Sequence, residues 1–564
     1  MWAVVLGMVL GCGGDGSDRT KRRPGGTEPT GDTAASVGSL ATGDTGTATG
    51  STGATASTGD TGPVSDWDTS YRCEALGGWP WIEDIPVPGE ACTYEEPLPS
   101  ATPGVVAFID AIATARITGD VGGQLGTALA LLDDVDGDGT GELAIGRPGI
   151  VDFYGHTMET EGEVWYFPGL SVQGELQRED VPSVLPSRTP DWDLPKWGDA
   201  SWLTVGDLTG DGRPELVVGG AGYNPTFGVP LPPPAGEHFL EDVSLISLDT
   251  PGGYTFDHPT MGDVDGDGQV DLLFAGHGSQ RCSTGGAVLV PGPMVGGDLQ
   301  TTYMLEGRFH VDALDPPGVS SCSGEYGSRV LWDLDGDGDD EVLVSGESMR
   351  NVQPTDPKDP QAEHGGFAVF DGGPRDTYGA EEARAVVYSE CSGQVGYGGL
   401  EPVGDVTGDG QPDLAVGAYD FGFASELGTR GAVFVASELH RARGTVPLSA
   451  VSCATIFGDE VGNDLFTAGY VGDLDGDGFD DLAVADQHAF GMEGAVYLFR
   501  GPVSGLQMAS EADVILLGDG GLGKVVRGGV DLDGDGLGDL VVSAAGWDGV
   551  VYMVSGADVA ALFP

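Results

Sequence analysis

The segment Asp134-Val135-Asp136-Gly137-Asp138-Gly139-Thr140-Gly141-Glu142 is the first of seven copies of one acidic loop. Each copy reads Asp-x-(Asp/Thr)-Gly-Asp-Gly-x-x-(Asp/Glu) and is followed by a short apolar run. A recurrence at intervals of 56 to 73 residues indicates an array of supersecondary units. The seven copies begin at Asp134, Asp207, Asp263, Asp333, Asp405, Asp473 and Asp531.

The composition of the loop predicts a metal site. Side-chain oxygens at positions 1, 3, 5 and 9, with the backbone carbonyl of position 7, can converge on one hard cation, and the glycines permit the tight turn. Oxygen donors without nearby His or Cys favour calcium over zinc or copper. We therefore predict up to seven calcium ions, with weaker binding where Thr209 and Thr407 replace a carboxylate at position 3.

The predicted ligand residues are those at positions 1, 3, 5, 7 and 9 of each loop. In the first three loops they are Asp134, Asp136, Asp138, Thr140 and Glu142, then Asp207, Thr209, Asp211, Arg213 and Glu215, then Asp263, Asp265, Asp267, Gln269 and Asp271. In the last four they are Asp333, Asp335, Asp337, Asp339 and Glu341, then Asp405, Thr407, Asp409, Gln411 and Asp413, then Asp473, Asp475, Asp477, Phe479 and Asp481, then Asp531, Asp533, Asp535, Leu537 and Asp539.

Two other interpretations of the loops are an EF-hand and a solvated turn without metal. An EF-hand places a bidentate Glu at position 12 and flanks its loop with helices. Position 12 is apolar in all seven copies, and it lies in short aliphatic runs such as Leu216-Val217-Val218 that are typical of buried strands. Seven recurrences with matched ligand positions disfavour a turn without metal. The position-12 residues are Ile145, Val218, Phe274, Val344, Val416, Val484 and Val542.

A second strand pattern follows each loop and predicts the architecture. It is usually opened by glycine, as at residues 366–370 and 494–498. Each unit thus holds about four short antiparallel strands, as in one propeller blade. We predict an all-β fold, a seven-bladed β-propeller over residues 104–564, with residues 105–117 supplying the outer strand that closes the seventh blade.

The calcium loops, with the Gly/Ala pattern that follows them at Val416-Gly417-Ala418, resemble the FG-GAP repeats of the integrin alpha-subunit propeller and its bacterial relatives. The Phe-Gly of that repeat is replaced here, for example by Leu125-Gly126 and Tyr326-Gly327. The resemblance implies calcium-stabilised extracellular recognition rather than catalysis.

The connections between the second and third strands should emerge on the face opposite the metal loops. We expect them at residues 147–162, 221–241, 277–285, 347–365, 419–430 and 487–493, and long variable loops on a rigid scaffold often carry binding function. Several of these connections carry aromatic side chains, which either face a ligand or pack onto the blades. They are Phe153, Tyr154, Tyr223, Phe227, Tyr419, Phe421, Phe423 and Trp547.

The charge balance limits the partners. The chain has 24 basic and 89 acidic residues, a formal net charge of −65. Phosphate binding needs Lys/Arg clusters that this sequence lacks, so nucleic acid is not an expected partner. Repulsion among unfilled loops should destabilise the metal-free form, and calcium binding should therefore be linked to folding stability.

The N-terminal 103 residues divide into three expected segments. Residues 1–12 form a short apolar stretch that fits a secretory signal, and Val9-Leu10-Gly11-Cys12 resembles a bacterial lipobox in which Cys12 is lipidated. Residues 13–65 are rich in Gly, Ser and Thr and should form a disordered linker. Residues 66–103 form a small Cys-containing segment. We expect an exported chain that is lipid-anchored at the bacterial outer membrane or cell surface, or else secreted, with no other membrane contact.

Six cysteines remain beyond Cys12, and an even number in an exported chain suggests three disulfides. Fifteen pairings are open; the local guess is Cys73–Cys92, with Cys282–Cys322 and then Cys391–Cys453.

Enzyme motifs are weak. Residues 518–524 resemble a phosphate loop, but Val525 stands where that loop needs Ser or Thr. We predict a non-enzymatic propeller that recognises an extracellular protein or glycan. The alternatives are a propeller hydrolase or lyase acting on polysaccharide and a structural envelope lipoprotein.

Overall fold

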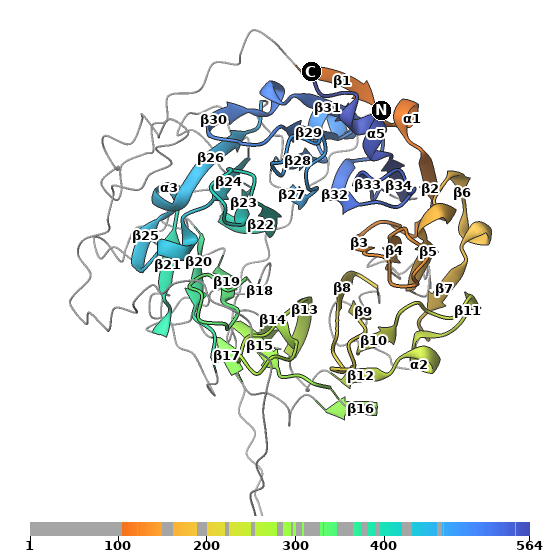
Figure 1. Cartoon of the computed structure of the whole chain (residues 1–564), viewed down its shortest axis with the longest axis horizontal. Helices are drawn as coiled ribbons and strands as arrows, with labels where there is room; N and C mark the ends of the chain where they lie inside the picture. Colours follow the sequence, from red (N-terminus) through yellow and green to blue (C-terminus); the bar gives the residue numbers. More distant parts are fainter. Residues whose placement is uncertain are drawn as a thin grey trace, which may run out of the picture. The chain divides into compact units, whose positions relative to one another are not determined.

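Seven β-sheets make up the described part of the chain, and one acidic loop connects the first and second strands of each. The fold is a seven-bladed β-propeller, as predicted (Figure 1). The computed structural model describes residues 104–120, 122–148, 162–188, 200–219, 225–249, 254–278, 286–294, 297–300, 307–309, 328–330, 332–346, 365–373, 382–389, 395–419, 431–459, 465, 467–546 and 549–564.

These residues all belong to one compact unit, Val64–Pro564. The expected leader with Cys12, the linker and the segment at 66–103 lie outside the described residues. Within the described ranges, no helix is long and apolar enough to cross a membrane.

Each blade is an antiparallel sheet that runs from the centre of the ring outward. Blade 1 holds β3 (Ala128–Leu132), β4 (Glu142–Arg147), β5 (Glu163–Pro168) and β7 (Ser183–Pro186). Blade 2 holds β8 (Trp202–Gly206), β9 (Glu215–Gly219), β10 (Thr226–Pro230) and β12 (Ile246–Asp249). Blade 3 holds β13 (Tyr254–Gly262), β14 (Asp271–Gly278), β15 (Gly286–Val290) and β17 (Gly307–Phe309). Blade 4 holds β18 (Ser328–Val330), β19 (Val342–Gly346), β20 (Gly366–Phe370) and β21 (Ala385–Tyr388).

The last three blades follow the same order. Blade 5 holds β22 (Val395–Gly404), β23 (Asp413–Ala418), β24 (Ala432–Ala436) and β26 (Ser452–Phe457). Blade 6 holds β27 (Thr467–Tyr470), β28 (Leu482–Asp486), β29 (Ala495–Phe499) and β31 (Val514–Leu517). Blade 7 holds β32 (Leu522–Val530), β33 (Asp539–Ala544), β34 (Val550–Val554) and β2 (Ala115–Thr118).

The two ends of the chain close the ring. The N-terminal β2 pairs antiparallel with the C-terminal β34, with Ile117 opposite Val551. The innermost strand of blade 7, β32, contacts the innermost strand of blade 1, β3. The prediction that residues 105–117 complete the seventh blade therefore holds for β2 alone, because residues 105–108 form β1 and pair with β31 of blade 6.

A fifth, parallel strand extends six of the seven sheets within the described ranges, and the sequence analysis did not predict it. In five sheets this strand belongs to the connection between the third and fourth strands of the following blade. The sixth, β1, lies before β2 and occupies the same place in the closed ring. Neighbouring blades are thus joined by backbone hydrogen bonds at the rim. The pairs are β11 (Gly236–Glu237) on β7, β16 (Gly297–Gln300) on β12, β25 (Gly444–Pro447) on β21, β30 (Gly505–Met508) on β26, β1 (Val105–Phe108) on β31, and β6 (Gly174–Leu176) on β2.

Short helices occupy the connections. The α-helices are α1 (Ile109–Ile112), α2 (Leu240–Val243), α3 (Leu448–Val451), α4 (Ala489–Met492) and α5 (Gly556–Ala560), and the 3-10 turns are η2 (Gly169–Ser171), η3 (Arg178–Asp180), η7 (Leu439–Arg441) and η8 (Ala509–Glu511).

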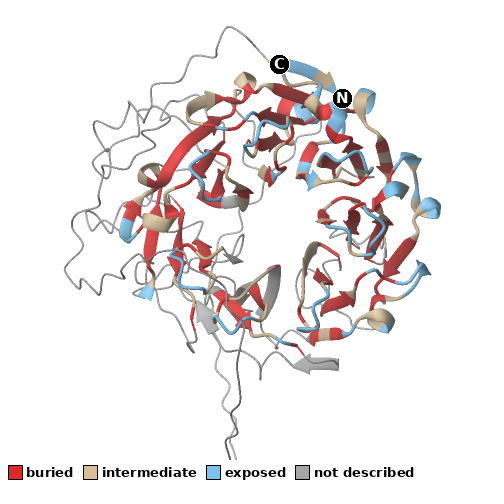
Figure 2. Ribbon diagram, in the orientation of Figure 1, coloured by how far each residue is buried: buried red, intermediate tan, exposed pale blue. Residues whose placement is uncertain are grey.

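The core consists of seven apolar clusters in the described residues, one at each interface between neighbouring blades. The run Leu540-Val541-Val542 shows how one strand serves two clusters. Leu540 and Val542 face blade 6, and Val541 faces blade 1. Because side chains alternate between the faces of a sheet that is covered on both sides, the run is continuously apolar. Figure 2 shows the buried residues along the strands of all seven sheets.

One predicted connection is wrong. Residues 221–241 were expected to join the second and third strands of blade 2, with Phe227 either facing a ligand or packed onto the blades. Residues 226–230 are instead the third strand, β10, and Phe227 is 3% exposed in the cluster between blades 1 and 2. The Gly and Pro residues around this segment are typical of a loop, and the short strand is stabilised by the strands that pack beside it. The other described residue of the aromatic set, Tyr419, is half-buried in the turn after β23, and the rest lie outside the described residues.

The close approach of blades 6 and 7 gives a test of this packing. A Cβ at Gly469 in β27 would lie 2.0 Å from the Val526 carbonyl oxygen in β32. We expect Gly469→Ala to lower the free energy of unfolding by about 1–3 kcal/mol, because backbone must move to relieve the overlap. The measurement is the thermal midpoint with calcium present. Gly219→Ala is the control, since its Cβ would meet nothing nearer than 3.5 Å; equal midpoints for the two variants would contradict the packing.

Candidate metal centres

The backbone of every acidic loop folds in the same way. The glycines at positions 4 and 6 have positive φ in all seven loops, between 70° and 103°. A non-glycine residue rarely adopts this conformation. The resulting turn directs backbone N–H groups toward the first aspartate. In loop 1, Gly137 and Asp138 donate to Asp134 Oδ1 at 2.6 and 2.9 Å, and Gly139 donates to Oδ2 at 2.9 Å.

The carboxylates at positions 3 and 5 are oriented by the same kind of bond. In loop 6, the Asp477 N–H donates to Asp475 Oδ1 at 3.0 Å, and the Phe479 N–H donates to Asp477 Oδ1 at 3.0 Å. The aspartates of each loop are therefore held on one side of the turn before any ligand is considered.

The carboxylate at position 9 begins the second strand and is buried. Glu142, Glu341 and Asp539 are each 0% exposed. It accepts the N–H of a loop residue at position 2 or 3, as where Leu532 donates to Asp539 at 2.8 Å. In loops 3, 6 and 7 its second oxygen accepts an N–H from the residues after the third strand, those of Gly292, Gly501 and Gly556.

Carboxylate oxygens from different positions of a loop converge. Oxygens of Asp134, Asp136 and Glu142 lie within 4.8 Å of one another, and so do those of Asp263, Asp265 and Asp271. In loop 2 the group consists of Asp207, Asp211 and Glu215. Because calcium binds oxygen at 2.3–2.6 Å, two of its ligands can be up to about 5 Å apart. The residues present therefore fit a calcium ion.

Burial raises the pKa of the position-9 carboxyl in every loop, and neighbouring carboxylates raise it further. In loop 1 these neighbours are Asp136 and Asp134. A buried negative charge with like charges beside it is unfavourable, and a divalent cation removes that cost. The pKa is raised to about 7 in Glu142, Glu341, Asp481 and Asp539, to about 6 in Asp271 and to about 8 in Asp413, and it is also raised in Glu215.

The two threonines at position 3 contact the same carboxylate. Thr209 Oγ1 donates to Glu215 Oε1 at 3.2 Å, and Thr407 Oγ1 donates to Asp413 Oδ1 at 3.2 Å. A hydroxyl thus satisfies part of the position-9 carboxylate in loops 2 and 5 and contributes no charge. The weaker binding expected in these two loops stays a prediction.

Position 7 has a role that the sequence did not reveal. Its side chain packs against the position-4 glycine of a neighbouring loop. A Cβ at Gly266 would lie 1.8 Å from Asp339, and one at Gly408 would lie 3.0 Å from Phe479. Thr140 lies in the same way beside Gly534. The predicted ligand at position 7 was its backbone carbonyl, and the side chain serves contact between blades.

Backbone hydrogen bonds also join neighbouring loops. The Gly141 N–H of loop 1 donates to the Asp531 carbonyl of loop 7 at 2.7 Å, and the Asp340 N–H of loop 4 donates to the Asp263 carbonyl of loop 3 at 2.8 Å. Two position-8 aspartates add side-chain bonds. Asp340 accepts the Asp263 N–H, and Asp480 accepts the Asp405 N–H, both at 2.9 Å. An acidic residue directly before position 9 was the available signal for these contacts.

Of the predicted disulfide residues, Cys453 is the one within the described ranges, where it is buried in β26 beside Ser437. The other cysteines lie outside them, so the pairings stay predictions. Residues 518–524, which resemble a phosphate loop in sequence, run into strand β32 (Leu522–Val530) rather than into a helix.

Comparison with known proteins agrees with this architecture. Residues 401–435 and 466–499 match the FG-GAP repeat family and contain loops 5 and 6. Integrin alpha-5 of Xenopus laevis is 33% identical over 160 residues, which are 26% of this chain and 14% of that protein. Integrin alpha-4 of Xenopus laevis is 28% identical over 185 residues, 31% of this chain and 17% of that protein. Integrin alpha-7 of Homo sapiens is 32% identical over 163 residues, 28% of this chain and 13% of that protein.

The chain therefore matches less than a fifth of the length of these relatives. Its β-propeller contains two segments that match FG-GAP repeats, and it is similar to integrin alpha chains over part of its length. Among solved structures, BBS1N in complex with ARL6DN aligns with 79% of this chain and 95% of that chain, at 10% identity and a TM-score of 0.40. The Dos1 propeller aligns with 78% and 95%, at 10% identity and a TM-score of 0.36.

The contact between loops 5 and 6 can be tested at Asp480. We expect Asp480→Ala to lower the free energy of unfolding by about 1–3 kcal/mol, because the Asp405 N–H loses a charged acceptor. Asp480→Asn keeps an acceptor oxygen and should lie close to wild type. The measurement is chemical denaturation of the three proteins. An alanine variant as stable as the asparagine variant would contradict a stabilising bond between the loops.

Proposed function

We propose that this chain is a calcium-binding propeller of the cell surface or extracellular space that recognises a protein or glycan partner. The observation that carries the calcium assignment is the buried position-9 carboxylate, which recurs in all seven loops beside further carboxylates. Similarity to integrin alpha chains supports an extracellular, adhesion-type role.

The proposed role is binding rather than catalysis. Among the described residues, the carboxyl groups with raised pKa values lie in the acidic loops, apart from Glu438, which is raised chiefly by burial and lies beside Asp409 of loop 5. Catalytic acids commonly stand out by such shifts. Here the loops account for them, and the metal role uses the same groups.

The proposed recognition surface is the face opposite the acidic loops. In blade 6, the connection between β28 and β29 reaches this face and contains α4. Phe490 and Met492 are 54% and 62% exposed there, and both have positive φ, 54° and 83°. Two large apolar side chains held exposed in a strained backbone suggest a binding role. A hydrogen bond fixes the start of the connection, where the Asp486 carboxylate accepts the His488 N–H at 2.8 Å.

Calcium is expected to determine the stability of the chain. Chelation should lower the thermal midpoint of the wild type, because it removes the divalent counter-charge from the buried carboxylates. A midpoint that is unchanged by chelator would contradict the calcium proposal.

The effect of Glu142→Gln should change sign with calcium. With calcium the variant loses a charged ligand, so its midpoint should fall below that of the wild type. In chelator at pH 8 the variant lacks a buried charge next to Asp134 and Asp136, so its midpoint should equal or exceed that of the wild type. Glu179→Gln, an exposed carboxylate in η3, is the control and should have little effect in either condition.

Recognition can be tested by capture of partners from envelope and extracellular-matrix fractions, with calcium and with chelator. We expect a partner that is retained with calcium and lost with the double variant Phe490→Ser, Met492→Ser. The matched control is Leu170→Ser, which removes an apolar side chain 53% exposed beside loop 7, on the other face. A partner retained by the double variant would place recognition elsewhere, and no calcium-dependent partner would favour a structural or enzymatic role.

A further inference from the structure

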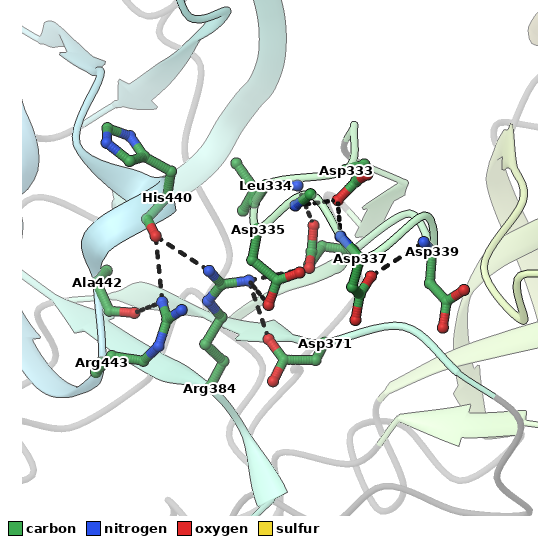
Figure 3. A network of polar contacts seen from close by, with 12 residues as sticks. Asp333, Leu334, Asp335, Asp337, Asp339, Asp371, Arg384, His440, Ala442 and Arg443 are labelled. Carbon is green, nitrogen blue, oxygen red and sulfur yellow. Dashed lines mark hydrogen bonds and ion pairs between the residues drawn. The ribbon is translucent and has the colours of Figure 1, made fainter. Parts of the chain in front are cut away.

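The fourth acidic loop contains a cation of its own. Arg384, directly before β21, has a side chain that is 1% exposed. Its Nη1 donates to Asp335 at 3.2 Å, to Glu341 at 2.9 Å and to Asp371 at 3.1 Å, and its Nη2 donates to the His440 carbonyl at 3.0 Å. Figure 3 shows the guanidinium between Asp335, Asp371 and the His440 carbonyl.

Two of these carboxylates occupy predicted metal-ligand positions. Asp335 is at position 3 and Glu341 at position 9 of the loop. In loops 1 and 3 the carboxylates at positions 3 and 9 group with the aspartate at position 1. In loop 4, Asp335 groups with Asp333 and Asp337. It also groups with Glu341 and Asp371, and this second group is the one that Arg384 contacts.

Asp371 is specific to blade 4. It follows β20 and lies opposite Glu341 in the register, since Val342 pairs with Phe370. The residues at this place in the other blades are Pro168, Pro230, Pro291, Ser437, Arg500 and Ser555. Blade 4 therefore combines a third carboxylate with a buried guanidinium at this place, and none of the other blades has that combination.

The fold fixes Arg384 in this position. Its carbonyl accepts the Gly444 N–H at 2.8 Å, at the start of the fifth strand β25, and its side chain reaches His440 in the same connection of blade 5. Arg443 adds a second positive charge, and its Nη1 donates to the Ala442 carbonyl at 2.8 Å and to the His440 carbonyl at 3.3 Å. A calcium ion that used Asp335 and Glu341 would lie beside a guanidinium that cannot lose its charge.

We propose that Arg384 is the resident cation of the fourth loop, so that this loop binds calcium far more weakly than the other loops with four ligand carboxylates. Blade 4 is then fastened to blade 5 without metal. Only the weak calcium binding of the fourth loop rests on the proposed function. The ion-pair role of Arg384 is independent of calcium.

Loop 6 also has an arginine in contact with its carboxylates, but the arrangement differs from that of Arg384. Arg500 contacts Asp475 and Asp477 there, at positions 3 and 5. Its side chain is 42% exposed, and Asp481 at position 9 is bonded by the Gly501 N–H instead. Arg500 can therefore turn toward solvent when an ion binds, whereas Arg384 is enclosed.

The test is the number of calcium ions bound by the full chain in equilibrium dialysis at millimolar free calcium. We expect Arg384→Gln to bind one more ion per chain than wild type, because Asp335 and Glu341 become available. Arg178→Gln is the matched control. Arg178 also joins a strand residue, Glu163, to a fifth-strand residue, Glu237, but neither belongs to an acidic loop. Its ion count should equal that of wild type.

A second pair of variants applies if Arg384→Gln does not fold. We expect Glu341→Gln to leave the ion count unchanged and Glu142→Gln to lower it by one. The inference would be overturned if Glu341→Gln bound one calcium ion fewer than the wild type and Arg384→Gln bound no more than the wild type.

The chelator measurement separates this inference from the proposed function. In chelator, Arg384→Gln should have a lower thermal midpoint than Arg178→Gln, because three carboxylates lose their counter-charge, and calcium should restore part of the loss. A wild type that binds no calcium would contradict the proposed function. In that case the midpoint in chelator still decides the role of Arg384, and a midpoint equal to that of Arg178→Gln would refute it.

Discussion

The fold depends on a carboxylate at the first residue of the second strand in each blade. The strand needs an apolar run to pack on both neighbours, yet a carboxylate such as Glu142 or Asp539 begins it and is fully buried. An unpaired buried charge costs several kcal/mol, so each blade requires a counter-charge at this point. Backbone N–H groups, a threonine hydroxyl in loops 2 and 5, and Arg384 in loop 4 supply part of it. In the proposed function, a calcium ion held by the oxygens of the acidic loop supplies the rest of the counter-charge.

The recurrence of the loop made the blade predictable from the sequence. Glycines at positions 4 and 6 specify one backbone conformation, and the apolar run after position 9 specifies a strand buried on both faces. Both signals are local, lying within about fifteen residues. Seven copies then specify seven blades, and an unpaired strand pattern before the first copy indicates how the ring closes. The fold class, the strand order within a blade and β2 could therefore be predicted.

The features that the sequence did not reveal are contacts between different blades. The fifth strands pair with a blade that precedes them, and their residues, such as Gly236 and Glu237, have no strand pattern. The strand that contains Phe227 was taken as a connection because it is stabilised by its neighbours rather than by its own composition. Arg384 lies 43 residues after Glu341, and its partner His440 a further 56 residues on. Nothing local marks such a pair, whereas the register that brings Asp371 opposite Glu341 follows once strands are aligned.

The acidic loops also form part of the interfaces between blades. The Gly141 and Asp340 N–H groups donate to carbonyl oxygens of neighbouring loops, and the position-7 side chains of four loops cover a glycine of the preceding loop in the ring. An ion that fixes one loop therefore also fixes the surface that the next blade packs against. Stabilisation by calcium would then spread around the ring rather than remain within one blade. Blade 4 differs, because Arg384 joins it to blade 5 through a charge that belongs to the chain itself. A ring closed in this way would keep one interface that does not depend on the calcium supply.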